Sequence, residues 1–67
     1  MVKHEESWYV RRLQLYYDKH YGKFDDATEW YGNPNPNQWM FVNYDIGMKV
    51  LLTCNENGEI VEERSKI

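Results

Sequence analysis

Three short runs of strand-forming residues, separated by two breaks that end in glycine, constrain this chain more than any other feature. The runs span Gln38–Tyr44, Met48–Asn55 and Glu59–Arg64. The breaks between them are Asp45–Gly47 and Glu56–Gly58. A glycine that closes a short connection between two alternating runs is typical of a β-hairpin. The sequence therefore predicts a three-stranded antiparallel β-meander.

The first hairpin has a predicted register. A three-residue loop with Gly47 in the left-handed conformation places Tyr44 opposite Met48. Because side chains alternate between the two faces of a strand, one face of the sheet is then predicted to form a core wall. That wall holds Met40, Val42, Tyr44, Met48, Val50, Leu52 and Cys54.

The register of the second hairpin stays open between two alternatives. A two-residue loop places Glu56 opposite Glu59, where the like charges repel. A three-residue loop that ends at Gly58 avoids this pairing. The third strand is rich in charged residues, as is typical of an edge strand protected against aggregation.

The segment before the meander has the spacing of an amphipathic helix that begins at Ser7 and stops at Gly22. Its apolar face repeats at i, i+4, i+7, i+8 and i+11, which is the period of an α-helix. A strand over Ser7–Tyr17 is the alternative, but its alternation breaks at Leu15. The predicted helical face comprises Tyr9, Leu13, Tyr16, Tyr17 and His20.

A second, shorter helix is predicted over Ala27–Tyr31. It would be opened by Asp25 or Asp26, because Asp26 and Glu29 have the spacing of a capping box. The Asn/Pro-rich segment 32–37 follows as a stiff connector, since two prolines exclude a helix and a strand interior. We therefore expect a single α+β domain over residues 1–67, with a frayed segment 1–6, two helices and a three-stranded antiparallel sheet.

The composition indicates a small intracellular domain. A chain of 67 residues buries a limited core, which eleven aromatic residues, all between Trp8 and Tyr44, can fill. Cys54 is the only cysteine, so an intrachain disulfide is excluded and a reducing compartment is favoured. The chain shows neither a signal-peptide pattern nor an apolar run long enough to span a membrane. We expect a cytoplasmic protein.

The two parts of the chain carry opposite charge. Residues 1–24 hold five basic and three acidic residues, a net charge of +2, whereas residues 25–67 hold three basic and eight acidic residues, a net charge of −5. A nucleic-acid-binding surface usually needs a strong basic excess, so nucleic acid is not an expected partner.

The same register places Trp39, Phe41 and Leu51 together on the face opposite the predicted core wall. In one interpretation, Trp30 and Tyr31 of the second helix cover this patch and form a second small core. In the other, the patch is exposed and binds a partner. If the patch is a binding site, Trp39→Ala should abolish association and leave the fold intact.

Catalysis, a metal site and a cofactor are not expected. Cys54 lies on the predicted core face, where a thiol is usually inert. His20 lies in the last helical turn and His4 in the frayed segment, without the spacing of metal ligands. The four glycines are isolated turn residues rather than a phosphate-binding loop.

The sequence therefore predicts a non-enzymatic module that binds another protein or forms a homodimer. One alternative is an acidic inhibitor that mimics nucleic acid, with Asp25, Asp26, Glu29, Glu56, Glu59, Glu62 and Glu63 as its charges. The other is a single-stranded nucleic-acid binder that uses the first helix, where basic and aromatic residues interleave. Those residues are Arg11, Arg12, Lys19 and Lys23 with Trp8, Tyr9, Tyr16, Tyr17 and Tyr21.

Overall fold

A computed structural model describes residues 4–22 and 26–67 and contains one helix, α1 (Glu6–His20). Tyr9, Leu13 and Tyr17 on this helix are buried at intervals of four residues, which confirms the predicted helical period. The helix begins one residue before Ser7, and Glu5 occupies the N-cap position without a side-chain capping bond. The first residues of the predicted frayed segment, 1–3, lie outside the described residues, as does Lys23.

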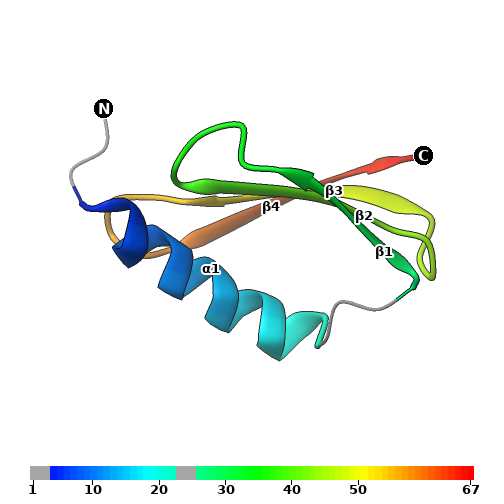
Figure 1. The fold of residues 1–67 in the computed structure, drawn as a ribbon, viewed down its shortest axis with the longest axis horizontal. Coiled ribbons are helices and arrows are strands. Elements are labelled where there is room, and N and C mark those ends of the chain that lie inside the picture. Colours follow the sequence, from blue (N-terminus) through cyan, green and yellow to red (C-terminus); the bar gives the residue numbers. More distant parts are fainter. Residues whose placement is uncertain (1–3, 23–25) are drawn as a thin grey trace.

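The sheet has four antiparallel strands in the order β1-β2-β3-β4, with α1 on one face (Figure 1). The strands are β1 (Thr28–Gly32), β2 (Gln38–Asn43), β3 (Met48–Cys54) and β4 (Ile60–Lys66). The predicted α+β class and the antiparallel meander are confirmed. The predicted count of three strands is wrong, because segment 28–32 adds a fourth.

The prediction of a second helix over Ala27–Tyr31 is also wrong, because most of this segment belongs to strand β1. Segment 28–32 pairs with the edge of β2, with Trp30 opposite Phe41 and Gly32 opposite Met40, so that Tyr31 forms a bulge. Pairing with a strand satisfies more backbone groups than a single isolated helical turn, and this outweighs the local capping signal. Asp25, one of the two predicted opening residues, lies outside the described residues.

The predicted connector is the loop of the β1–β2 hairpin. The Asn33 side chain donates a hydrogen bond of 3.2 Å to the Gln38 carbonyl. Asn37 pairs with the end of β3: its carbonyl accepts from the Cys54 amide at 2.9 Å, and its Nδ2 donates to the Cys54 carbonyl at 2.9 Å. The loop is therefore attached at its far end to the sheet.

The β2–β3 hairpin differs from the predicted register by one residue. Asn43 lies opposite Met48, so the connection 44–47 has four residues rather than three. The Asn43 side-chain oxygen accepts from the amides of Asp45 and Ile46 at 2.9 and 3.4 Å, which stabilises this longer turn. A shift of one residue exchanges the two faces of β2 relative to β3.

This shift changes which β2 residues enter the core. Val50, Leu52 and Cys54 of β3 are fully buried, as predicted. Their neighbours from β2 are Trp39 and Phe41, in place of Met40 and Val42. The prediction that Met40 and Tyr44 belong to this core wall is wrong, and Val42, although buried as predicted, lies on the opposite face of the sheet from Val50.

The β3–β4 turn follows the three-residue alternative. The Asn55 amide donates to the Glu59 carbonyl at 2.9 Å, and Cys54 lies opposite Ile60. Gly58 has a φ of +87°, which glycine adopts without a steric penalty. The Asn55 side-chain oxygen accepts from the amides of Asn57 and Glu59, at 2.9 and 3.0 Å.

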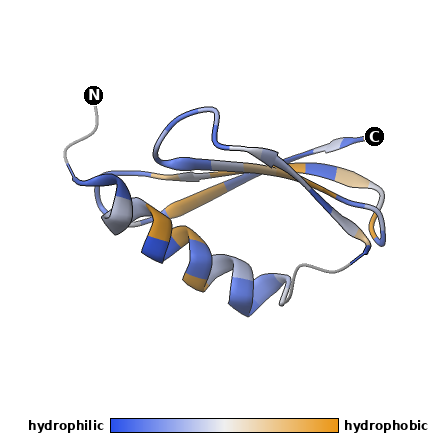
Figure 2. Ribbon diagram, in the orientation of Figure 1, coloured by the Kyte–Doolittle hydropathy of each residue, from blue (hydrophilic) through white to orange (hydrophobic). Residues whose placement is uncertain are grey.

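The core lies between α1 and strands β2, β3 and β4. Figure 2 shows apolar residues along the central strands and at intervals along the helix. Tyr17 packs edge-on against Phe41 with ring centres 5.2 Å apart, a favoured aromatic geometry. The core is made of Tyr9, Leu13, Tyr17, Trp39, Phe41, Val50, Leu52 and Cys54.

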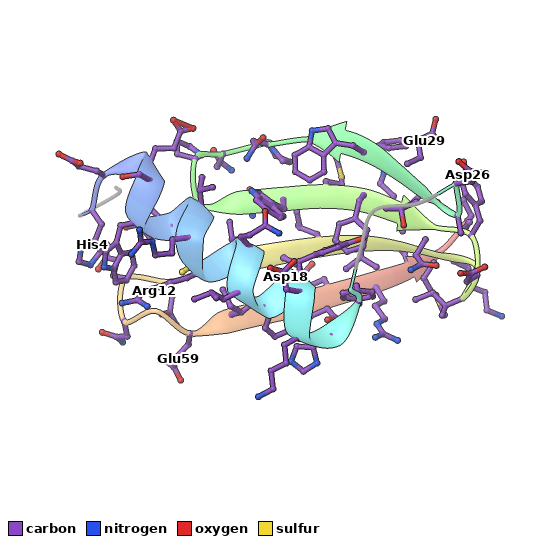
Figure 3. The ribbon with its side chains drawn as sticks, turned by 60° about the horizontal axis from the view of Figure 1, so that its bottom comes forward. His4, Arg12, Asp18, Asp26, Glu29 and Glu59 are labelled. Atoms are coloured by element: carbon purple, nitrogen blue, oxygen red, sulfur yellow. The ribbon has the colours of Figure 1, made fainter. Side chains whose placement is uncertain are left out.

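The start of the helix also packs against the β3–β4 turn (Figure 3). The His4 ring stacks on Trp8 with centres 3.6 Å apart, and the Arg12 guanidinium lies 4.1 Å from the centre of the same indole. His4 Nε2 is 3.0 Å from the Glu56 carbonyl oxygen. These contacts fix the first turn of α1 against the turn that joins the last two strands.

Candidate protein-binding surface

One face of the sheet is covered by α1, whereas no helix or strand of the described residues lies on the other (Figure 1). We call this second surface the open face. Antiparallel sheets commonly have one solvated face, and polar side chains usually dominate it. Here apolar side chains occupy its centre.

The central row of the open face crosses all four strands. Met40 lies opposite Leu51, Leu51 lies opposite Glu63, and the bulged Tyr31 extends the row on β1. Tyr31 is 51% exposed, and Met40 and Leu51 are half-buried. Val61, at 52% exposure, lies in the next row opposite Thr53.

Polar contacts at the β1 side hold the tyrosines of this face. The Tyr44 hydroxyl donates a hydrogen bond of 2.5 Å to Glu29, which, together with some burial, raises the pKa of Tyr44. Lys49 Nζ lies 5.8 Å from the centre of the Tyr31 ring, within cation–π range. The open face therefore has an apolar centre and a polar rim.

The structure separates the residues predicted to form the binding patch. Trp39 is 7% exposed and Phe41 is fully buried, both beneath α1 rather than opposite it. Leu51 is on the open face, in the same row as Tyr31. Trp30 is on the helix side, where its exposed ring packs edge-on against Trp39 at 5.3 Å.

Only Leu51 and Tyr31 of the predicted patch therefore share one surface. The reason is the register of the β2–β3 hairpin, which places Trp39 opposite Leu52. Met40 and Tyr44, predicted as core residues, belong to the open face instead, and Val61 joins them from β4. The signal that identifies them is Asn43, whose side chain favours a turn that begins one residue earlier.

The aromatic residues of α1 are engaged within the fold. Tyr9 and Tyr17 are buried in the core, and Trp8 is stacked against His4. Tyr16 donates a hydrogen bond of 2.9 Å to Glu62, and the Tyr21 hydroxyl accepts from Arg64 at 3.2 Å. Trp8, Tyr16 and Tyr21 are partly buried, so only part of each ring is available to stack on a nucleic-acid base.

The residues considered for catalysis lie apart from one another. Cys54 is fully buried; burial raises the pKa of its thiol, although the nearby positive charge of Arg12 partly opposes this. His20 is exposed and packs against the Tyr16 ring with centres 4.2 Å apart. Within residues 4–22 and 26–67, no cluster of His, Cys, Asp or Glu has the geometry of a metal site.

The helix of the described chain is neither long nor apolar enough to cross a membrane. Comparison of the sequence with protein-family models, and of the protein with curated proteins and solved structures, gave no match.

Proposed function

We propose that this protein is a small non-enzymatic binding module that recognises another protein through the open face of its sheet. The observation that carries the proposal is the row formed by Tyr31, Met40 and Leu51, which no described helix or strand covers. Tyrosine and methionine are enriched at protein interfaces, and an apolar centre with a polar rim is the usual arrangement there.

The charge of the sheet indicates the chemistry of the partner. Residues 25–67, which include all four strands, carry eight acidic and three basic residues. On the open face, the two carboxylates of Glu29 and Glu63 outnumber the one ammonium group of Lys49. A complementary partner therefore presents an apolar patch surrounded by lysine or arginine residues, and complementary charge accelerates its association.

Two matched substitutions test the proposal. Leu51→Lys introduces a charge at the centre of the open face, and Leu15→Lys introduces the same charge on the exposed outer side of α1, where Leu15 is 62% exposed. Proteins captured with the wild-type chain are purified, and their affinity for each variant is measured by calorimetry. We expect Leu51→Lys to weaken binding by about tenfold or more, since one charge in an apolar contact removes a hot spot.

The control variant should bind like the wild type, and thermal melts should show that both variants are folded. Equal affinity of the two variants for the purified partner would contradict the proposal. Light scattering across a concentration series tests self-association in parallel. A dimer that Leu51→Lys dissociates and Leu15→Lys does not would identify the partner as a second copy of the chain.

A further inference from the structure

The edge strand β4 presents a long and regular hydrogen-bonding edge. It is the outermost strand of the sheet in Figure 3, and no strand of residues 4–22 and 26–67 lies beside its outer edge. Its register with β3 runs without a bulge from Ile60 to Lys66. The other edge strand, β1, has five residues and is interrupted by the bulge at Tyr31. Of the two edges, β4 is therefore the better template for a further strand.

The backbone groups that point outward from β4 belong to alternate residues. At one end of the ladder the Asn55 amide donates to the Glu59 carbonyl, and at the other end the Ile67 amide donates to the Gly47 carbonyl. In an antiparallel pair, residues that bond to the neighbouring strand alternate with residues that face away from it. Odd-numbered residues of β4 therefore bond to β3. The residues whose amides and carbonyls point outward are Ile60, Glu62, Arg64 and Lys66.

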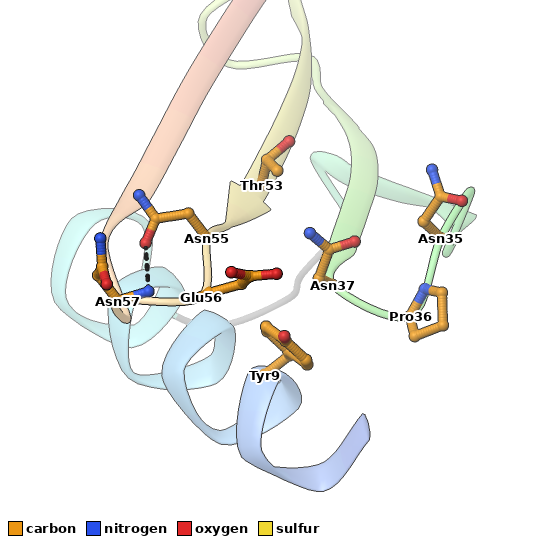
Figure 4. A pocket seen from close by; sticks show the side chains of 8 residues that line it. All are labelled: Tyr9, Asn35, Pro36, Asn37, Thr53, Asn55, Glu56 and Asn57. Carbon is orange, nitrogen blue, oxygen red and sulfur yellow. Dashed lines mark hydrogen bonds between the residues drawn. The ribbon is translucent and has the colours of Figure 1, made fainter. Parts of the chain in front are cut away.

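The β3–β4 turn fixes the start of this edge. The Asn55 side-chain oxygen accepts from the Asn57 amide at 2.9 Å, as drawn in Figure 4, and from the Glu59 amide at 3.0 Å. The Gly58 amide donates to the Asn55 carbonyl at 3.0 Å. These bonds hold β4 against β3 in one register, so its outer edge is preorganised for pairing.

The side chains of β4 form two rows that an added strand must match. On the helix side, one acidic residue is followed by two basic residues. On the open face, Val61 and Ile67, which are 52% and 63% exposed, stand at the two ends of a polar pair. The helix-side residues are Glu62, Arg64 and Lys66, and the open-face residues are Val61, Glu63, Ser65 and Ile67.

We propose that β4 pairs with β4 of a second copy of the chain, antiparallel, about a two-fold axis at Arg64. Such an axis keeps each face of the sheet beside the same face of the second copy, so odd-numbered residues lie opposite odd-numbered residues. Glu62 then lies opposite Lys66 of the second copy, and Val61 lies opposite its Ile67. By symmetry each pair occurs twice, and opposite charges or apolar side chains directly across a ladder stabilise it.

The two nearest registers are less favourable. Moving the axis to Glu63 places this carboxylate opposite its own copy, and moving it to Ser65 places Arg64 opposite Lys66 in both symmetric positions. In the proposed register the two Arg64 side chains also meet, but each already forms an ion pair with Glu62 of its own strand. The charges of β4 therefore disfavour most strands and match one.

Glu62 can accept the additional contact with Lys66. An ionised carboxylate offers about four acceptor positions, and hydrogen bonds from Tyr16, Tyr21 and Arg64 use three of them. Lys66 is exposed, and its long side chain can reach across the ladder. The pairing joins the two sheets into one and places their open faces side by side. It rests on the edge of β4 and does not depend on what the open face binds.

The test is the mass of the full chain in solution, measured by sedimentation equilibrium from micromolar to millimolar concentration. We expect a reversible equilibrium between monomer and dimer. Lys66→Glu makes both pairs with Glu62 repulsive and should weaken the dimer by about tenfold or more. Arg11→Glu makes the same change of charge on the exposed side of α1 and should dimerise as the wild type does. Thermal melts should show that both variants are folded.

Engineered cysteines identify the register, because the native Cys54 is fully buried. In the proposed pairing Glu63 lies opposite Ser65 of the second copy, with Cα atoms about 4.5 Å apart, which is within the range for a disulfide. An equimolar mixture of Glu63→Cys and Ser65→Cys chains should therefore form the mixed disulfide faster than either chain cross-links to itself.

Three results would overturn the proposal: a monomer at every concentration, equal dimerisation of Lys66→Glu and Arg11→Glu, or preferential cross-linking of Glu63→Cys to itself. A dimer that Leu51→Lys dissociates and Lys66→Glu does not would also overturn it, because the contact would then lie on the open face. The reverse result supports pairing through β4 and leaves the binding of another protein by the open face to be tested separately.

Discussion

The Tyr16 hydroxyl on α1 donates a hydrogen bond of 2.9 Å to the carboxylate of Glu62 on the edge strand β4. Tyr21 and Arg64 also hydrogen-bond to this carboxylate, whose side chain is only 16% exposed. Burial alone would raise the pKa of Glu62, but the hydrogen bonds from Tyr21, Arg64 and Tyr16 outweigh it and lower the pKa. The end of the helix is thus attached to the sheet through one ionised group.

Glu62 should make the protein sensitive to acid. Its pKa is lower in the folded than in the unfolded state, so its contribution to stability is present above the unfolded pKa, about 4.3, and is lost as the pH falls through the folded pKa. Glu62→Gln should reduce the free energy of unfolding at neutral pH by about 1–3 kcal/mol. When the free energy of unfolding is measured by urea titration from neutral pH to below pH 4, it should fall less steeply with decreasing pH in this variant than in the wild type.

The adjacent carboxylate provides the control for that measurement. Glu63 is exposed on the opposite face of the same strand. Glu63→Gln should therefore leave both the stability at neutral pH and its decrease at acidic pH almost unchanged. Equal effects of the two substitutions would show that the contact between α1 and Glu62 does not stabilise the fold.

Tyr21 should cause a second loss of stability at alkaline pH. Burial and the hydrogen bond to Glu62 raise the pKa of Tyr21 to about 12. A group with a raised folded pKa contributes stability that is fully present below its unfolded pKa, about 10, and that is lost as the pH rises toward the folded value. Tyr21→Phe should flatten the stability profile between these two values, measured by chemical unfolding. An unchanged profile would contradict this.

Gly58 should tolerate alanine worse than Gly47 does. Both have a positive φ, +87° and +66°, so each substitution costs about 1–2 kcal/mol of backbone energy. At Gly58 a Cβ atom would also lie 3.1 Å from Arg12 Nε, whereas at Gly47 it would meet nothing within 4 Å. We expect Gly58→Ala to destabilise the protein more, by thermal unfolding.

A double-mutant cycle separates the two effects at Gly58. If crowding against the guanidinium adds to the backbone cost, Gly58→Ala should be less costly in an Arg12→Ala background than in the wild type. An identical cost in the two backgrounds would assign the whole effect to the backbone.

Trp39→Ala should unfold the protein rather than only prevent association. The side chain is 7% exposed, and removing a buried tryptophan costs about 3–5 kcal/mol. For a domain of this size, that is most of a total stability of the order of 5 kcal/mol. Circular dichroism of the variant should show the loss of a cooperative thermal transition, and a folded variant would contradict the burial of Trp39.

The helix and the three C-terminal strands could be predicted because their signals are local. Tyr9, Leu13 and Tyr17 repeat with the helical period, and Gly47 and Gly58 mark the turns between alternating runs. Segment 28–32 could not be identified in this way, because its capping-box spacing favours a helix locally. It becomes a strand only when the edge of β2 is available, which is a tertiary contact.

The candidate surface was predicted less well than the fold, because its residues depend on register. One additional residue in the turn after Asn43 moves Trp39 and Phe41 from the open face into the core. Alternation within each strand is visible in the sequence, but the relative alignment of two strands is determined by the turn geometry. Leu51 keeps its predicted place on the face away from the helix, because the alternation within β3 does not depend on the alignment of β2.

The strand order β1-β2-β3-β4 has a consequence for how quickly the chain can fold. Each strand pairs only with its neighbour in sequence, so the sheet can grow by successive hairpin closures over short loops. Proteins dominated by such local contacts fold faster than those that must first join distant segments. Docking of α1 onto β2, β3 and β4 is then the long-range step, and we expect substitutions at that contact to limit the folding rate.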